Sequence, residues 1–153
     1  MANFAISCSF LDLSEELNEP PPKRFKPISD EEVLEIAKLA TPKNTIAKRQ
    51  WAFRVYVKWS EERGIGGDLC TMSLEDIDFH LSKFICEART LKGETYPSKT
   101  LYELISNIQG YLRDRGLDVS FFEKTSMTFR RLRSTLDGMM RKTSAEGEKR
   151  AGE

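Results

Sequence analysis

Histidine is almost absent from this sequence, since His80 is its single example among 153 residues. One imidazole excludes mechanisms that need two and makes most histidine-based catalysis depend on one residue. The three cysteines, Cys8, Cys70 and Cys86, show no C-x-x-C spacing, which disfavours a disulfide framework and a structural zinc site. We therefore expect no catalytic residue, no metal, no cofactor and a reducing intracellular setting.

Long apolar runs are also missing. No segment approaches the roughly 18 to 20 apolar residues that span a bilayer, and residues 1–13 have no basic stretch before their apolar residues. We expect neither a membrane protein nor a secreted one. The 24 Lys and Arg balance the 24 Asp and Glu, so the formal net charge of zero does not indicate a polyanionic partner. Charge can therefore indicate a partner only where residues of one sign are concentrated in one part of the chain.

The length and the 39% of hydrophobic residues are enough for one core. We predict a disordered acidic and proline-rich tail over 1–28, a helical domain over 29–142 and a disordered tail over 143–153. Three consecutive prolines at 20–22 favour an extended chain. An acidic and apolar segment before them would form an amphipathic helix only on a protein partner, through Phe10, Leu13 and Leu17.

Helical periodicity recurs along the domain, and no segment alternates as a strand does. The expected helices cover about 29–40, 44–63, 73–88, 97–116 and 126–141. Ser29, three residues before Glu32, predicts a capping box, and Asn44 or Thr45 is the expected cap of the second helix. The fold class is therefore all-α, a single bundle of about five helices.

Positive charge is concentrated on the second helix. Residues 41–60 contain no acidic residue and five basic ones: Lys43, Lys48, Arg49, Arg54 and Lys58. At about 100° per residue, Lys43, Arg54 and Lys58 fall in one narrow stripe. Such a stripe can follow a phosphate backbone, whereas the alternative is an ordinary solvated helix face.

The last helix predicts a second basic surface, with six basic residues and a single acidic one, Asp137, over 124–142. The basic residues are Lys124, Arg130, Arg131, Arg133, Arg141 and Lys142. Trp51 and Trp59, eight residues apart, could stack on bases, but aromatic residues at helical spacing more often belong to a core.

Other candidate motifs favour structural roles. His80 lies between Phe79 and Leu81 without a second ligand nearby, so we expect a satisfied, partly buried histidine. The glycine-rich segment 64–67 is not followed by Gly-Lys-Ser/Thr, which indicates a helix stop rather than a phosphate loop. No base accompanies Cys70 or Cys86 to make a nucleophile.

The order of several helix-start and apolar motifs resembles that of a known family. Asn44-Thr45 opens a helix with Phe53-x-x-Tyr56-x-x-x-Trp59, and Leu74-x-x-Ile77 opens the next. Then Tyr96-Pro97-Ser98-Lys99-Thr100-Leu101 leads into Ile105-x-x-Ile108-x-x-Tyr111-Leu112. Over about 43–116 the chain resembles the N-terminal core-binding domain, a SAM-like domain, of tyrosine recombinases and phage integrases. The run Phe129-x-x-Leu132-x-x-x-Leu136-Asp137-x-Met139-Met140-Arg141 is similar to their Crypton-derived branch in zinc-finger MYM-type and glutamine-rich proteins.

In that family this domain forms half of a clamp on duplex DNA, with basic and polar residues of two helices on grooves and phosphates. The resemblance implies DNA contacts at Lys43, Thr45, Lys48 and Arg49, and at Lys99 and Thr100. The charge stripe adds Arg54 and Lys58. The family's catalytic Arg, His-x-x-Arg and Tyr belong to a separate C-terminal domain, and His80 lies in the wrong domain and is followed by Leu81-Ser82-Lys83.

The sequence thus favours a non-catalytic module that binds double-stranded DNA mainly through its phosphates. Lys23, Arg24 and Lys26, set between prolines, resemble a short nuclear-import signal and suggest a nuclear location. The alternative is a helical protein-interaction scaffold, associated with transcription or chromatin, that has lost DNA binding; the zero net charge favours it.

Overall fold

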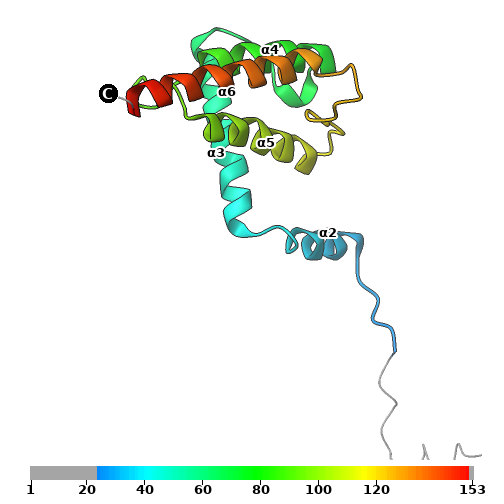
Figure 1. Ribbon diagram of the computed structural model, residues 1–153. Helices are drawn as coiled ribbons and strands as arrows, with labels where there is room; N and C mark the ends of the chain where they lie inside the picture. Colours follow the sequence, from blue (N-terminus) through cyan, green and yellow to red (C-terminus); the bar gives the residue numbers. More distant parts are fainter. Residues whose placement is uncertain (1–23, 152–153) are drawn as a thin grey trace, which may run out of the picture. The chain divides into compact units, whose positions relative to one another are not determined.

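The computed structural model describes residues 24–151, and this part of the chain is all-helical (Figure 1). Its elements are α2 (Asp30–Lys38), α3 (Lys43–Glu62), the short 3-10 helix η1 (Leu69–Thr71), α4 (Leu74–Glu87), α5 (Ser98–Asp114) and α6 (Arg130–Ala151). The predicted all-α class is confirmed. Within the described residues, no helix is both long and apolar enough to cross a membrane. Phe10, Leu13, Leu17 and Lys23 lie outside the described residues.

The described residues divide into two compact units, with the boundary between residues 40 and 41. The prediction of one domain over 29–142 placed α2 with the other helices, whereas this division places α2 in the first unit.

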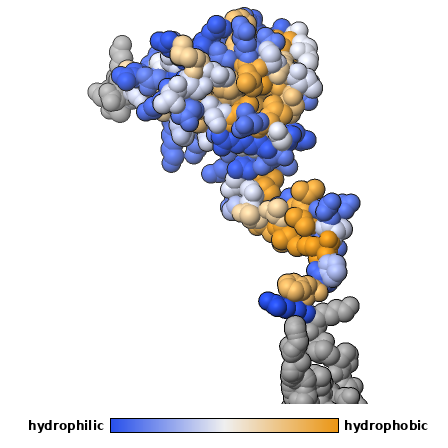
Figure 2. Space-filling model, turned by 90° about the vertical axis from the view of Figure 1, so that its right-hand side faces the viewer, coloured by the Kyte–Doolittle hydropathy of each residue, from blue (hydrophilic) through white to orange (hydrophobic). Residues whose placement is uncertain are grey.

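The Ser29 side chain caps α2 as expected, accepting a hydrogen bond from the Glu32 N–H at 3.1 Å. No residue of α2 is buried, and Val33, Leu34 and Ile36 are exposed on it. Figure 2 shows apolar surface on this part of the chain. Arg24 and Lys26 are exposed in the non-helical segment before it.

Helices α3 and α5 begin in the same way, directly after a proline. Pro42 and Pro97 occupy the N-cap positions with extended backbones, and no described side chain caps either helix. The expectation that Asn44 or Thr45 caps α3 is wrong because the proline, with its φ already near the helical value, starts the helix earlier. By contrast, Ser73 caps α4 by accepting from the Asp76 N–H at 3.1 Å.

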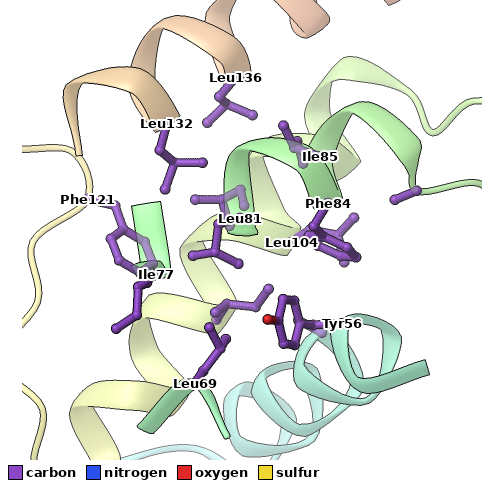
Figure 3. Packing of buried hydrophobic residues seen from close by; sticks show 14 of the residues in the cluster. Tyr56, Leu69, Ile77, Leu81, Phe84, Ile85, Leu104, Phe121, Leu132 and Leu136 are labelled. Atoms are coloured by element: carbon purple, nitrogen blue, oxygen red, sulfur yellow. The ribbon is translucent and has the colours of Figure 1, made fainter. Parts of the chain in front are cut away.

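The core lies between the four helices of the second unit. Helix α4 packs on α6, and α5 packs on both α3 and α6. Apolar side chains from all four helices converge there, including Tyr56, Leu81, Phe84, Leu104 and Leu132 (Figure 3). Trp59, 8% exposed, belongs to this core, as its helical spacing favoured. Its indole N–H donates to Glu87 Oε1 at 2.8 Å, so α3 and α4 are joined near their C-terminal ends.

The connection between α5 and α6 is held by the side chain of Arg133. Its guanidinium donates to the carbonyl oxygens of Phe121 at 3.2 Å, Thr128 at 2.9 Å and Ser126. These bonds close the loop over Phe129, which is buried at a positive φ of 65° that costs a non-glycine residue about 1 kcal/mol. Phe129 meets the Phe121 ring edge-to-face with centroids 4.7 Å apart.

Helix α6 continues well past the predicted end of the domain. The expectation of a disordered tail from residue 143 is wrong up to Ala151, because residues 143–151 form the last turns of α6. Thr143 is buried and its hydroxyl lies 2.8 Å from that of Ser98 at the start of α5. Ser98 Oγ also donates to the Met140 carbonyl oxygen at 2.6 Å, so α5 begins against the second half of α6.

Candidate nucleic-acid interface

Three cations lie along one edge of α3, as the helical arithmetic predicted. Lys43, Arg54 and Lys58, which we call the α3 basic edge, are all exposed. None of them forms an ion pair with a described carboxylate. The opposite side of the helix is buried through Ala52, Tyr56 and Trp59, so core packing leaves the basic edge to solvent.

Arg49, one of the expected DNA contacts, has a partner within the protein. Its guanidinium donates to both carboxylate oxygens of Asp114, at 3.1 and 3.0 Å. The side chain crosses α5 over Gly110, where an added Cβ would lie only 2.3 Å from Arg49 Nε. Gly110 therefore makes room for a bond that ties α3 to α5, and Arg49 is partnered within the protein.

The remaining predicted contacts lie near the two uncapped helix starts. Thr45 is half-buried and Lys48 exposed in the first turns of α3, while Lys99 is exposed and Thr100 half-buried in the first turn of α5. The first backbone bonds join Ile46 N to Pro42 O at 3.1 Å and Leu101 N to Pro97 O at 3.0 Å. The preceding amides have no partner within their helix, and such amides can bind an anion.

A cleft of about 610 Å³ opens beside the basic edge. One wall is α3, which contributes Arg54, Lys58 and the half-buried Trp51. The other wall is the end of α4 and the turn that follows it, with Arg89 and Tyr96. Burial raises the pKa of the Tyr96 phenol, which accordingly stays neutral and offers an aromatic face with a hydroxyl.

Two carboxylates also line this cleft, Glu62 and Glu87. Glu87 Oε1 accepts from the Trp59 indole at 2.8 Å and lies 3.2 Å from Arg63 Nε, so its charge is compensated. Glu62 forms no ion pair with a described residue. Cations therefore outnumber uncompensated acids at the cleft.

The second basic surface predicted on the last helix is not continuous, because folding engages half of its cations. Arg133 holds the loop before α6, Arg141 pairs with Asp137 at 3.0 Å and Arg131 lies 3.9 Å from Asp78. Lys124, Arg130 and Lys142 are exposed without an ion pair to a described residue.

The other candidate residues show no arrangement for chemistry. Burial raises the pKa of the Cys70 and Cys86 thiols, and the nearby charges of Asp68 and Glu87 raise them further, which disfavours a thiolate. His80 is half-buried as expected, but the prediction of a satisfied ring is wrong, since its Nδ1 is buried without a described partner. No cluster of metal-ligating side chains occurs in the described part of the chain.

Sequence reasoning missed the second wall of the cleft. Arg89 and Tyr96 stand 31 and 38 residues after Lys58, and only the packing of α4 and α5 against α3 brings them opposite Arg54. A bulky aromatic directly before the Pro97-Ser98 helix start was the single available signal at Tyr96.

A family model, described as the QRICH1 domain, matches residues 41–143. The chain belongs to the QRICH1 domain family. Its match starts at the first residue of the second unit and ends at the buried Thr143. The QRICH1 domain therefore includes α3, α4, α5, the first part of α6, the basic edge and the cleft, and it leaves out α2. No curated protein and no solved structure matches the chain.

Proposed function

We propose that the QRICH1 domain of this chain is a non-catalytic, nuclear module that binds double-stranded DNA through its phosphates. The α3 basic edge carries the proposal. Arg49, Arg63, Arg131 and Arg141 each have a carboxylate partner within the protein. Lys43, Arg54 and Lys58 remain available to a polyanion.

The two uncapped helix starts also support the proposal. Lys48 near the start of α3 and Lys99 near that of α5 accompany amides that lack an intrahelical partner, and Thr45 and Thr100 add hydroxyls there. Phosphates bind such combinations of backbone N–H groups and cations. The resemblance to the core-binding domain of tyrosine recombinases points to the same two helix starts, and we propose common ancestry with it.

The test compares two triple charge reversals. We expect the full chain to bind an arbitrary duplex of about 30 base pairs with micromolar affinity at low salt, and Lys43→Glu, Arg54→Glu and Lys58→Glu together to weaken binding about tenfold or more. The matched control reverses three exposed cations elsewhere, Lys83, Lys124 and Arg130, with the same change in net charge. Fluorescence anisotropy with a labelled duplex measures both. Equal losses in the two variants, or no binding at low salt, would refute the proposal.

A protein-interaction scaffold is the second candidate, and the apolar lining of the cleft favours it. Trp51 and Val55 stay half-buried there, and Leu91 is entirely exposed beside them. Absence of duplex binding at low salt, in a chain with native circular dichroism, would support this candidate over the first.

A further inference from the structure

Leu91 is presented to solvent by a tight turn at the mouth of the cleft. Its relative exposure is 104%, so this leucine contacts almost nothing within the protein. The turn is nonetheless well defined: Thr90 N donates to Glu94 O and Gly93 N to Thr90 O, each at 2.8 Å, and Gly93 supplies a φ of +84°. Leu91 lines the same cleft as the half-buried Trp51, Val55 and Tyr96, so it extends an exposed apolar patch, and such patches mark contact surfaces.

The cleft beside Leu91 is apolar at its base and cationic at its rim. Trp51, Val55 and Tyr96 form its accessible apolar surface, over the buried rings of Trp59 and Phe84. Trp59 and Phe84 pack edge-to-face with centroids 5.6 Å apart, so the base of the cleft is part of the packed core.

Cations border this apolar surface on both walls. Arg54 and Lys58 lie on α3, and Arg89 lies on the opposite wall. The Arg89 guanidinium is held in place because it donates to the carbonyl oxygens of Cys86 at 3.1 Å and Ala88 at 2.8 Å, at the end of α4. The other N–H groups of this guanidinium can donate hydrogen bonds to a ligand.

We propose that this cleft is a docking groove for an acidic amphipathic helix of a partner protein. The apolar face of the partner helix, with side chains at positions i, i+3 or i+4 and i+7, lies against Trp51, Val55 and Leu91. Its carboxylates face Arg54, Lys58 and Arg89. Nucleic acid fits less well, because Leu91 and Val55 offer nothing to a phosphate.

Duplex binding is not required for this docking, but the two share Arg54 and Lys58. If the chain binds duplex as proposed above, the partner helix and the duplex compete for those side chains. The partner would then release the domain from DNA.

The test uses a fluorescein-labelled synthetic helix of about 15 residues, with leucines on one face and glutamates on the other. Its counterpart has lysines in place of the glutamates. Leu91→Ser removes the exposed anchor, and Leu74→Ser, at an exposed leucine on α4 outside the cleft, is the matched control. We expect micromolar binding of the acidic helix, a loss of about tenfold in Leu91→Ser and no change in Leu74→Ser, since burial of a leucine contributes about one power of ten or more.

Duplex binding is measured in the same variants, so the two proposals fail separately. Leu91→Ser should leave duplex affinity unchanged. Equal affinity of Leu91→Ser and the original chain for the acidic helix, or equal binding of the lysine counterpart, would overturn the docking proposal whatever the duplex result. Tighter binding of a single-stranded oligothymidine that displaces the acidic helix would assign the cleft to nucleic acid instead.

Discussion

Tyr56 has a hydroxyl group that the core buries without giving it a hydrogen-bond partner among the described residues. Its ring packs with those of Trp59 and Phe84 at centroid distances of 5.6 and 5.4 Å, so the aromatic contacts do not depend on the hydroxyl. A buried polar atom without a partner costs free energy. Tyr56→Phe should therefore raise the free energy of unfolding at neutral pH, by up to about 1 kcal/mol.

The same residue makes stability depend on alkaline pH. Burial, and to a lesser extent the charge of Asp68, raises the pKa of Tyr56 from 10.0 to about 12. The phenol is protonated in both states below pH 10, so its contribution is complete there and is lost as the pH rises from 10 towards 12. The slope is about 1.4 kcal/mol per pH unit. Urea denaturation at several pH values should show this loss in the original chain relative to Tyr56→Phe, with Tyr102→Phe, an exposed tyrosine, as control. Parallel pH profiles in the original chain and Tyr56→Phe would contradict it.

Arg130 and Arg133, both near the start of α6, carry the same charge but have different structural roles. Arg133 donates to three carbonyl oxygens of the preceding loop, whereas Arg130 is exposed without an ion pair to a described residue. Arg133→Ala leaves those carbonyls without their donor and should lower the free energy of unfolding by about 2–3 kcal/mol. Arg130→Ala should change it by less than about 0.5 kcal/mol. Chemical denaturation of both variants measures the difference, and similar values would show that the loop does not depend on Arg133.

The extension of α6 gives a second prediction for an element. Truncation after Lys142 removes Thr143 and with it the hydroxyl beside Ser98 Oγ. Loss of this buried contact and of the last turns should lower the free energy of unfolding by about 1–2 kcal/mol. Truncation after Gly147 keeps Thr143 and Ser144 and should cost much less. Thermal unfolding of the two shortened chains distinguishes them. Identical midpoints would show that Thr143 and the residues after it do not contribute to stability.

Across the whole molecule, the zero net charge conceals an uneven distribution. The proposed DNA contacts include five exposed cations: Lys43, Lys48, Arg54, Lys58 and Lys99. If each neutralises one phosphate, the logarithm of the duplex binding constant should fall against the logarithm of salt concentration with a slope of about −4 to −5. Reversal of the three residues of the α3 basic edge should reduce that slope by about 3. A slope near zero, or one unchanged by the reversal, would show that these cations do not neutralise phosphates.

The sequence by itself determined the helices, because helix starts and apolar spacing are local properties of the chain. Ser29 indicated a helix cap, apolar periodicity indicated the helix over 73–88, and the stripe of Lys43, Arg54 and Lys58 followed from helical geometry alone. The start of α3 was predicted slightly too late, because both Pro42 and Asn44 are residues that favour the start of a helix.

Only the tertiary structure decided which cations are available and where the cleft lies. Arg49 and Asp114 are 65 residues apart, so no local pattern could reveal their bond, and the close crossing at Gly110 that permits it exists only after α3 packs on α5. Tyr96 and Arg54 face each other for the same reason. Charge pairing and concavity depend on distances through space, which the order of residues leaves open until the core fixes the helices against one another.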